Sequence, residues 1–466
     1  MNKFHAKLRS NEPPTGVFPS DLTSTQARFV GSEAGTLALI ALVWLVSRVG
    51  FFLLYSPGID PDSETYLLLA RQIAGLDFTD YNGQRTPGYP ILLLATCSNP
   101  LLIWIIQSLM SLGTAILLFL LARAHGSSRA LALVIALTYL LVLNTLFYES
   151  AVLTETASAF LLVLVSYLFL KAVRQGMTPL SATGLGLAVA ALVLTRPQYI
   201  FMIPLIGLLA GCLRGRRWLA ILAFMIVSSL PVIGWMNFNK HQIGQFSLTS
   251  LLGYNLSNHT GAFMEKASDE HSLFRDIYVK YRDEKMRETG GHQMTIFRAR
   301  DELKQASGLG EVGLSARFQR ISVELIGQNP MLYGVSVAKA WASFWAVPRY
   351  GQRQNIHGGT LATAFDWIWK IQHPLLRLLN AVFLVCSALL ALQMLRTWKQ
   401  GIGDSAAPAF MATVVLATSV VQALAEYGEN PRYFIPSQPL VIAATALALL
   451  VLVHTYRRQP VEKVTA

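Results

Sequence analysis

Several carboxylates and arginines of this chain lie directly beside long apolar runs, where ionisable side chains are costly and tend to mark function. Asp60 and Asp62 precede Tyr66 in the polar segment after the first apolar run. Asp60 before Pro61 suits a helix N-cap, and acidic residues near a helix N-terminus are favoured electrostatically. An ionised carboxylate in this position can also act as a general base toward a hydroxyl group. Both explanations fit the segment.

Three arginines stand beside prolines or aromatic residues in other polar segments. Arg85 begins the stretch Arg-Thr-Pro-Gly-Tyr-Pro, Arg196 precedes Pro197, and Arg432 precedes Tyr433. Arginine suits phosphate because its planar guanidinium donates two parallel hydrogen bonds to phosphate oxygens. Arg85 taken alone is equally well explained as an interfacial anchor, whose stem lies against apolar surface while its charge reaches water.

Glu155 opens another apolar run, directly after Thr154. Thr154 suits an N-cap, and an acidic residue one position later complements the positive end of the helix dipole. Because apolar residues follow at once, we expect Glu155 either to cap the helix or to meet a cation.

Carboxylates and arginines gathered at one membrane surface suit a particular reaction. The carboxylate deprotonates a hydroxyl group while the arginines hold a phosphate leaving group. A phosphate ester departs with little help from a general acid. One carboxylate base with one or two arginines is therefore sufficient for sugar transfer from a lipid phosphate, provided that the fold brings these groups together.

The elements that must position these groups are membrane helices. Of the 466 residues, 53% are hydrophobic and 14% are charged, with a mean hydropathy of +0.44, so the composition indicates a membrane protein. Spanning a bilayer takes roughly 20 apolar residues in a helix. About ten runs approach this length, which predicts an all-α polytopic membrane protein with about ten transmembrane helices. The runs are 36–55, 99–122, 130–147, 154–170, 180–194, 198–213, 218–236, 375–395, 407–425 and 437–455.

The distribution of lysine and arginine predicts the orientation, because these residues gather on the cytoplasmic side of membrane proteins. A chain that starts in the cytoplasm places its basic clusters on that side, together with both termini. This accounts for the net charge of +12 without nucleic acid as a partner. The carboxylates and arginines described above then face the periplasm. The cytoplasmic clusters are Lys3 to Arg28, Arg123 to Arg129, Lys171 to Arg174, Arg214 to Arg217, Arg396 to Lys399, and Arg457 to Lys463.

The predicted topology also divides the chain into parts. Two transmembrane modules flank a long periplasmic region, and short cytoplasmic segments lie at both ends. The parts are a cytoplasmic segment at 1–34, a transmembrane module at 35–236 with a periplasmic first loop at 56–90, a periplasmic region at 237–374, C-terminal transmembrane helices at 375–456, and a cytoplasmic tail at 457–466.

Helices are also expected outside the spans. The first loop has an apolar stripe that includes Tyr66 and Ala70, which predicts a short amphipathic helix on the membrane. Residues 265–324 hold 22 of the 64 charged residues, 11 acidic and 11 basic, which indicates solvated helices. The apolar stretch 329–347 is interpreted as an interfacial helix, because an eleventh span would move the C-terminal basic clusters to the periplasm.

The histidines of the periplasmic region give no sign of a metal site. His241, His259, His271 and His292 lack close metal-ligand spacing such as an i, i+4 pair. We interpret all four as solvated side chains.

Taken together, the motifs resemble the membrane glycosyltransferases of the GT-C superfamily, in particular the group that includes protein mannosyltransferases, aminoarabinose transferases and bacterial relatives. The resemblance covers most of the chain from the first span onward, and the motifs match in order and spacing. It is specific for the superfamily and does not identify the sugar or the acceptor. The matching residues are Asp62, Tyr66 and Ala70; Arg85, Pro87, Gly88, Tyr89 and Pro90; Glu155; Arg196 and Pro197; and Arg432 and Tyr433.

This resemblance implies a GT-C fold and an inverting transfer of a hexose or pentose. The donor is expected to be a polyprenyl-phosphate sugar, and the acceptor a hydroxyl group of a glycan, a lipid or a protein. The resemblance implies Asp62 as the catalytic base, Asp60 as the second candidate, and Arg85 and Arg432 as phosphate contacts. The other substrate-binding candidates are Tyr66, Tyr89, Glu155, Arg196 and Tyr433.

The resemblance leaves the metal question open, because some relatives bind a metal ion near the base. Glu155 is expected to orient Arg85 or, together with Asp62, to hold a divalent cation. Gln84 stands where such relatives can carry a second acid. We therefore expect that no cofactor is required, with a divalent cation as the alternative.

The resemblance also implies a bacterial inner-membrane protein, in contact with membrane lipids, whose active site faces the periplasm. Two other classes stay open. A lipid-linked polysaccharide polymerase or ligase also uses outer-face arginines, and a lipid-phosphate flippase binds the same headgroup. A flippase would usually show internal repeats or polar breaks within several spans, and the sequence has neither feature.

Overall fold

The computed structural model describes residues 21–212, 218–397 and 405–458. These residues form helices and two isolated β-bridges, with no β-strand among them. Several basic side chains used to predict the orientation lie outside the described side chains. They are those at positions 3–28, 214–217, 399 and 457–463.

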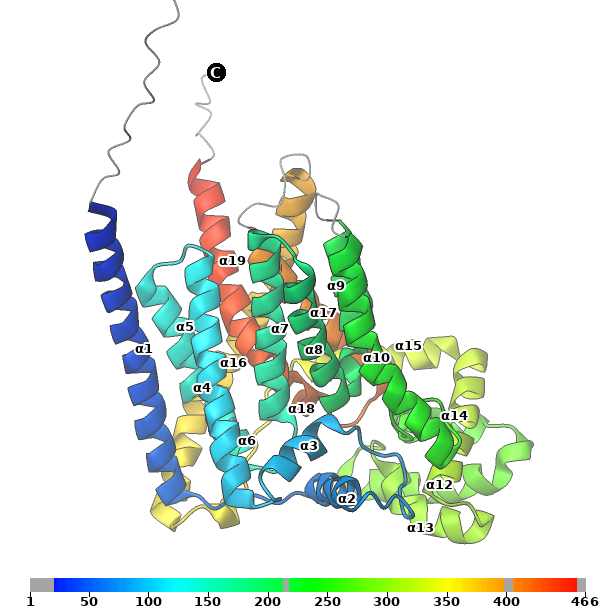
Figure 1. Ribbon diagram of the computed structural model, residues 1–466. Helices are drawn as coiled ribbons and strands as arrows, with labels where there is room; N and C mark the ends of the chain where they lie inside the picture. The colour runs from blue at the N-terminus through cyan, green and yellow to red at the C-terminus, as the bar shows by residue number, and fades with distance from the viewer. Residues whose placement is uncertain (1–20, 213–217, 398–404, 459–466) are drawn as a thin grey trace, which may run out of the picture.

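Seven helical segments in the described part of the chain are long and apolar enough to cross a membrane. They run roughly parallel in Figure 1, and the ends of the first and last helices that lead to the two termini lie at the same end of the bundle. The prediction of an all-α, multi-pass membrane protein is confirmed. The long helices are α1 (Asp21–Leu54), α4 (Pro100–Ala124), α7 (Glu155–Gln175), α10 (Trp218–Ile243), α16 (Gly359–Thr397), α17 (Ala406–Ala425) and α19 (Gln438–Arg458).

The three remaining predicted spans form shorter or bent helices. The run at 130–147 becomes α5 (Arg129–Leu141) and α6 (Leu143–Ser150), which meet at a bend of 52° and can count as one eighth span. One of the two others forms α8 (Pro179–Thr195), and the other forms η1 (Pro197–Phe201) followed by α9 (Met202–Gly211). Both are shorter than a typical span. Within the described residues, length and composition thus support seven or eight spans, against the predicted ten.

The first loop contains the predicted amphipathic helix, α2 (Pro61–Gly75). Asp60 is its N-cap residue, and its backbone N–H donates to the Ser63 hydroxyl at 2.9 Å. Tyr66 and Ala70 lie on the buried face of the helix, as their spacing predicted. In Figure 1, α2 lies across the direction of the long helices, at the end of the bundle opposite the termini.

Gly88 lets the return of the first loop pack closely on the bundle. It begins α3 (Gly88–Ala95), and a Cβ atom placed on it would lie 2.6 Å from the backbone carbon of Leu194, near the end of α8. No side chain fits at that distance. The Pro-Gly-Tyr-Pro sequence therefore fixes the position of α3 against α8, next to Arg196.

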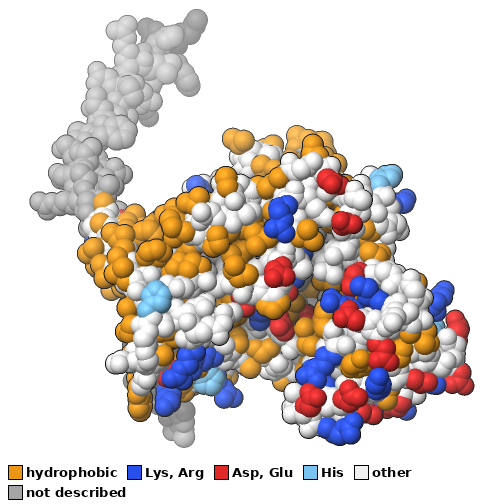
Figure 2. Space-filling model, turned by 90° about the horizontal axis from the view of Figure 1, so that it is seen from below, with side chains coloured by type: hydrophobic (Ala, Val, Ile, Leu, Met, Phe, Trp, Pro, Cys, Tyr) orange, Lys and Arg blue, Asp and Glu red, His pale blue; other side chains and the backbone are white. Residues whose placement is uncertain are grey.

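The predicted periplasmic region forms a group of helices with its own hydrophobic core, which contains buried Tyr254, Tyr278 and Phe318. Acidic and basic side chains are interspersed over its surface, on the right of Figure 2. The stretch at 329–347 forms α15 (Pro330–Phe344), a helix of 15 residues that is too short to be an eleventh span. The other helices are α11 (Leu252–Thr260), α12 (Ser272–Thr289), α13 (Thr295–Ser307) and α14 (Glu311–Gln328).

The prediction that all four histidines are solvated is wrong for His259 and His271. Both are buried in this group of helices, where His259 Nδ1 lies 2.8 Å from the Ser336 hydroxyl and His271 Nε2 lies 3.2 Å from a Glu324 carboxylate oxygen. Burial lowers the pKa of His259 to about 4. Polar helices that pack into a separate core bury some of their polar residues, which composition alone does not indicate.

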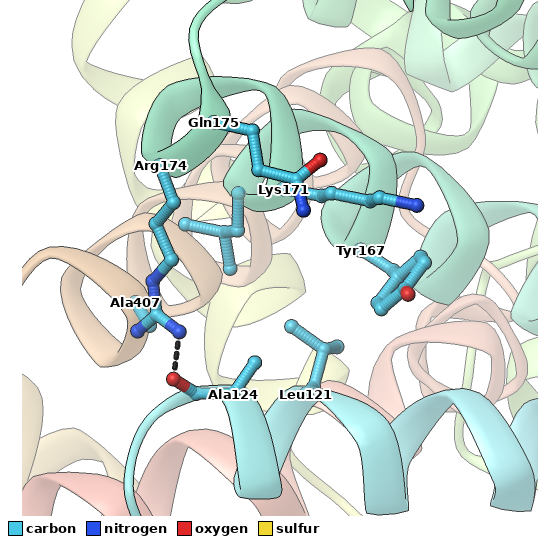
Figure 3. Close-up of a pocket in the computed structure, with 8 residues that line it drawn as sticks. Leu121, Ala124, Tyr167, Lys171, Arg174, Gln175 and Ala407 are labelled. Carbon is cyan, nitrogen blue, oxygen red and sulfur yellow. Dashed lines mark hydrogen bonds between the residues drawn. The ribbon is translucent and has the colours of Figure 1, made fainter. Parts of the chain in front are cut away.

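A cavity of about 130 Å³ lies at the end of α4 and α7 that is opposite α2. Figure 3 shows Arg174 pointing toward α4, where its guanidinium donates a hydrogen bond to the carbonyl oxygen of Ala124. Leu121, Tyr167 and Leu170 supply an apolar lining. Basic side chains commonly satisfy the last carbonyl groups of a helix, so Arg174 serves to cap α4.

Arg48 of α1 and Glu149 of α6 form a buried ion pair that the sequence did not predict. Arg48 Nε donates to Glu149 Oε2 at 3.0 Å, its Nη2 donates to Oε1, and its Nη1 donates to the Leu140 carbonyl at 2.9 Å. Ser108 also donates to this carboxylate. Both charged side chains are almost fully buried, so this pair joins α1, α4 and α6 in the apolar part of the bundle.

We predict that Arg48→Met destabilises the protein by about 3–5 kcal/mol, because it leaves Glu149 buried without its cation. Thermal unfolding of the purified protein in detergent measures this loss. The double variant Arg48→Met/Glu149→Gln should recover much of the stability. The control is Arg123→Met, which removes a partly exposed pair with Glu33 and should cost less than about 1 kcal/mol. Equal losses in both single variants would contradict the prediction.

Candidate active site

A cavity of about 300 Å³ lies at the α2 end of the bundle. Its lining comes from α2, the loop before α3, the turn between α8 and η1, the start of α11, and the end of α17 with the segment that follows. Figure 2, seen from this end, shows acidic and basic side chains in the recess between the membrane helices and the outer group of helices. The cavity lining therefore includes both charged and apolar side chains.

Asp62 stands at the centre of this charged group. It lies in the first turn of α2, where its Oδ1 accepts a hydrogen bond from Arg85 Nη2 and its Oδ2 accepts one from Arg432 Nη1, both at 2.7 Å. Arg85 precedes α3, and Arg432 belongs to α18 (Asn430–Phe434). Three segments that are distant in sequence thus meet at one carboxylate.

Arg85 is held by α2 through every nitrogen of its guanidinium. Its Nε donates to the Thr65 hydroxyl at 2.7 Å, and its Nη1 donates to the Tyr66 hydroxyl at 3.1 Å, in addition to the contact with Asp62. The guanidinium carbon also lies 4.4 Å from the centre of the Tyr66 ring, a favourable cation–π distance. Arg85 is therefore a fixed part of the site and not a mobile interfacial anchor.

Glu155 meets two cations instead of serving only as a helix cap. Its Oε1 accepts hydrogen bonds from Arg196 Nη2 and from Arg432 Nε, both at 2.6 Å. The Thr154 hydroxyl accepts from Arg196 Nε at 2.8 Å and makes no capping hydrogen bond. The expectation that Glu155 orients Arg85 is wrong, because Arg85 donates to side chains of α2 and not to Glu155. Glu155 orients Arg196 and Arg432.

The other predicted site residues lie in the cavity wall or behind it. The Tyr433 ring lies 5.2 Å from the Arg196 guanidinium. Tyr89 packs edge-on against Tyr66 at 5.2 Å between ring centres, and its hydroxyl donates to Gln107. The cavity is lined by Asp62, Tyr66, Arg85, Arg196, Arg432 and Tyr433, whereas Asp60, Tyr89 and Glu155 are not among its lining residues.

Asp60 is placed differently from Asp62. Its carboxylate accepts a hydrogen bond from the Tyr350 hydroxyl, and Tyr350 in turn stacks on Tyr148 with 4.2 Å between ring centres. Asp60 thereby joins the N-cap of α2 to the segment after α15. This geometry favours Asp62 over Asp60 as the candidate base, although both remain predictions.

The surroundings of Asp62 keep its carboxyl group ionised. Burial by itself raises the pKa of Asp62, but the charges and hydrogen bonds of Arg85 and Arg432 outweigh burial, and the pKa lies below its ordinary value. An ionised carboxylate offers about four acceptor positions. The two arginines use one on each oxygen, so Asp62 retains room to accept a proton from a hydroxyl group.

Glu426 is a cavity residue to which the sequence analysis gave no role. It follows α17, is 4% exposed, and accepts a hydrogen bond from Gln422 Nε2 at 3.2 Å. Burial raises its pKa to about 7, with a smaller contribution from the nearby charge of Glu429. The sequence offers one signal that could have identified Glu426. It is an acidic residue directly after an apolar run, and Gln422 stands one helical turn before it.

The charged group does not offer an evident metal site. In the parts of the chain that the structure describes, no three His, Cys, Asp or Glu side chains come close enough together to hold a metal ion. Asp62 and Glu155, the two possible ligands, are bridged by Arg432, which contacts both carboxylates at 2.6–2.7 Å. A guanidinium therefore occupies the position between them that a divalent cation would need.

Comparisons with solved structures show that the overall structure of this chain is similar to that of known proteins. No protein-family model and no curated protein matches this chain. The archaeal oligosaccharyltransferase AglB from Archaeoglobus fulgidus, in complex with an inhibitory peptide and a dolichol-phosphate, is similar with a TM-score of 0.47 and 15% identity over 91% of this chain and 51% of that chain.

A second similar structure is the Archaeoglobus fulgidus oligosaccharyltransferase tethered by a disulfide bond to an acceptor peptide that contains the NVT sequon. Its TM-score is 0.46 and its identity 16%, over 91% of this chain and 50% of that chain. This chain thus spans about half the length of both structures. Its function has to be inferred from its own residues.

The titration of Glu426 gives a testable consequence for any phosphate-bearing ligand of the cavity. As the pH falls from about 8 to about 6, Glu426 passes through its raised pKa of about 7 and loses its negative charge. We expect binding of a phosphate lipid to tighten severalfold over this range, because a repulsive charge is removed. Binding of polyprenyl phosphate to wild type and to Glu426→Gln, measured across this range, tests the prediction. The variant should bind more tightly than wild type at pH 8 and should keep only the pH dependence of the lipid phosphate, whose second pKa is about 6; a pH dependence equal to that of wild type would contradict the assignment.

Proposed function

We propose that this protein is an inverting glycosyltransferase that moves a sugar from a polyprenyl-phosphate donor to a hydroxyl acceptor. The observation that carries this proposal is the ionised Asp62 carboxylate, held by Arg85 and Arg432 in the wall of a cavity beside apolar helices. A base and phosphate-binding cations in one site are the groups that such a transfer requires.

In the proposed reaction, Asp62 accepts the proton of the acceptor hydroxyl as its oxygen attacks the anomeric carbon of the sugar. The bond from that carbon to the phosphate oxygen breaks, and the electron pair leaves with the phosphate. Attack opposite to the leaving group inverts the anomeric configuration. The arginines around the site stabilise the charge that grows on the departing phosphate.

The cavity also suits the amphiphilic nature of a lipid-linked donor. Ile200, Leu251, Leu252 and Val421 line it alongside the charged residues. Ligand sites of this type join an apolar surface to a few oriented polar groups. A polyprenyl chain can therefore lie against the bundle while its phosphate reaches the arginines, with membrane lipids around both.

We further propose a bacterial inner membrane as the location and the periplasm as the side of the reaction. The support is the charge pattern of the short loops in the sequence, together with the described Arg123, Lys171 and Arg174, which lie at the end of the bundle away from Asp62. The same separation favours a transferase over a flippase, because the charged group lies at one end of the helices and not at their middle. A polymerase or ligase remains the alternative, with a lipid-pyrophosphate donor.

We predict that Asp62→Asn lowers sugar transfer by about 100-fold or more, because it removes the base while keeping the size of the side chain. The measurement is acceptor-dependent release of radiolabelled sugar from a panel of polyprenyl-phosphate donors by protein in lipid nanodiscs. Asp80→Asn is the matched control, because Asp80 is exposed, lies in the same loop and does not line the cavity. Wild-type transfer by Asp62→Asn would reject Asp62 as the base.

We also infer that the reaction needs no divalent cation, since Arg432 bridges the two carboxylates that would hold one. Transfer should be unchanged by excess EDTA, and added magnesium or manganese should not raise it. A loss of transfer on chelation that is restored by one of these ions would overturn this inference and would point to a rearrangement of Arg432.

A further inference from the structure

Two residues that line the cavity each carry a buried hydrogen-bond donor that has no acceptor among the described residues. Nη1 of Arg196 and Nε2 of Gln198 are both buried, and neither makes a hydrogen bond of normal geometry in the described part of the chain, although the Gln198 side chain lies near the Tyr199 hydroxyl, which also lacks a partner. Both residues line the cavity. Buried polar groups are rarely left without a partner in folded proteins, so a pair of them in one cavity calls for a ligand that supplies acceptors.

The neighbouring arginines Arg85 and Arg432 make more hydrogen bonds to protein groups, and neither has a nitrogen that is both buried and without a partner. The three nitrogens of Arg85 all donate to side chains of α2, and Arg432 donates to three carboxylates. Arg196 differs: Thr154 and Glu155 accept from its Nε and Nη2, and its Nη1 is left over. Among the three arginines, Arg196 is thus the one whose buried nitrogen lacks an acceptor in the described residues, whereas Nη2 of Arg432 also makes no hydrogen bond to them but is not buried.

The two donors come from one constrained segment. Arg196 has an extended backbone, with φ −141° and ψ 110°, between the end of α8 and η1 (Pro197–Phe201). The ring of Pro197 restricts the backbone between them. Contacts with Glu155 and with the Tyr433 ring further fix the Arg196 side chain. The segment is therefore held in place by the protein itself.

We propose that Arg196 and Gln198 form the subsite that anchors the phosphate of the lipid-linked donor, a proposal that rests on the function proposed above. Arg196 Nη1 and Gln198 Nε2 donate to two of the phosphate oxygens. One group supplies charge, and the other supplies a neutral directed hydrogen bond. Arg85 and Arg432 meanwhile keep Asp62 in position. This assigns a substrate-binding role to Gln198.

The test compares binding of two lipids that differ only in the phosphate, polyprenyl phosphate and the polyprenol of the same length. Gln198→Glu replaces the neutral donor with a negative charge and should weaken binding of polyprenyl phosphate by about tenfold or more, while polyprenol binding stays within about twofold. Gln198→Leu removes the donor without adding charge and should show a smaller loss in the same direction. Binding is measured for the full-length protein by native mass spectrometry or with radiolabelled lipid in nanodiscs.

Gln72→Glu is the matched control, because it makes the same substitution on α2 outside the cavity lining and should leave both affinities unchanged. Equal binding of polyprenyl phosphate by wild type and Gln198→Glu would overturn the proposal. An equal loss of polyprenol binding would also overturn it, since Gln198 would then support only the shape of the cavity. Displacement by an equal amount of phosphatidylglycerol would overturn it in favour of general phospholipid binding.

The same proteins separate this subsite from the proposed function. If wild type binds polyprenyl phosphate through Gln198 but transfers no sugar from any donor, the subsite stands and the glycosyltransferase proposal fails. If wild type transfers sugar and Gln198→Glu binds polyprenyl phosphate equally well, the glycosyltransferase proposal stands and the subsite fails.

Discussion

The bridge that Arg432 makes between Asp62 and Glu155 is the interaction on which the candidate site depends. Charges that leave water are tolerated only when they are paired and hydrogen-bonded. Here one guanidinium satisfies a carboxylate from α2 and another from α7, and Glu155 also holds Arg196. The position of each charged group is therefore set by the others, so the site forms as a unit.

The apolar bundle gives this charged group its rigidity. The charged residues are attached to helix ends: Asp62 to the first turn of α2, Glu155 to the first residue of α7, and Arg432 to a short helix before α19. Packed helices move little relative to one another, since protein interiors are dense. The close approach at Gly88 adds to this rigidity, because it holds the Arg85 segment against the end of α8.

The pKa values of two acidic residues in this cavity are shifted in opposite directions. Asp62 has two arginine partners, and its pKa is lowered despite partial burial. Glu426 is more deeply buried and is held by Gln422 and Tyr433 instead of a guanidinium partner, so burial dominates and raises its pKa to about 7. Such separation is typical of sites in which neighbouring carboxyl groups have different roles. It leaves Asp62 ionised and makes Glu426 responsive near neutral pH.

The sequence by itself determined the membrane-helix architecture, the amphipathic helix α2 and most members of the charged group. Apolar runs and the ionisable residues beside them can be recognised locally, because a charged side chain next to a membrane span is energetically costly. Tertiary structure decided the partners. Glu155 pairs with Arg196 and Arg432 instead of Arg85, and Arg48 meets Glu149 from a distant span. Local patterns also predicted more long spans than the described residues form, and they predicted that two buried histidines are solvated. Pairing and burial depend on which helix ends meet in space, and residue spacing along one chain does not contain that information.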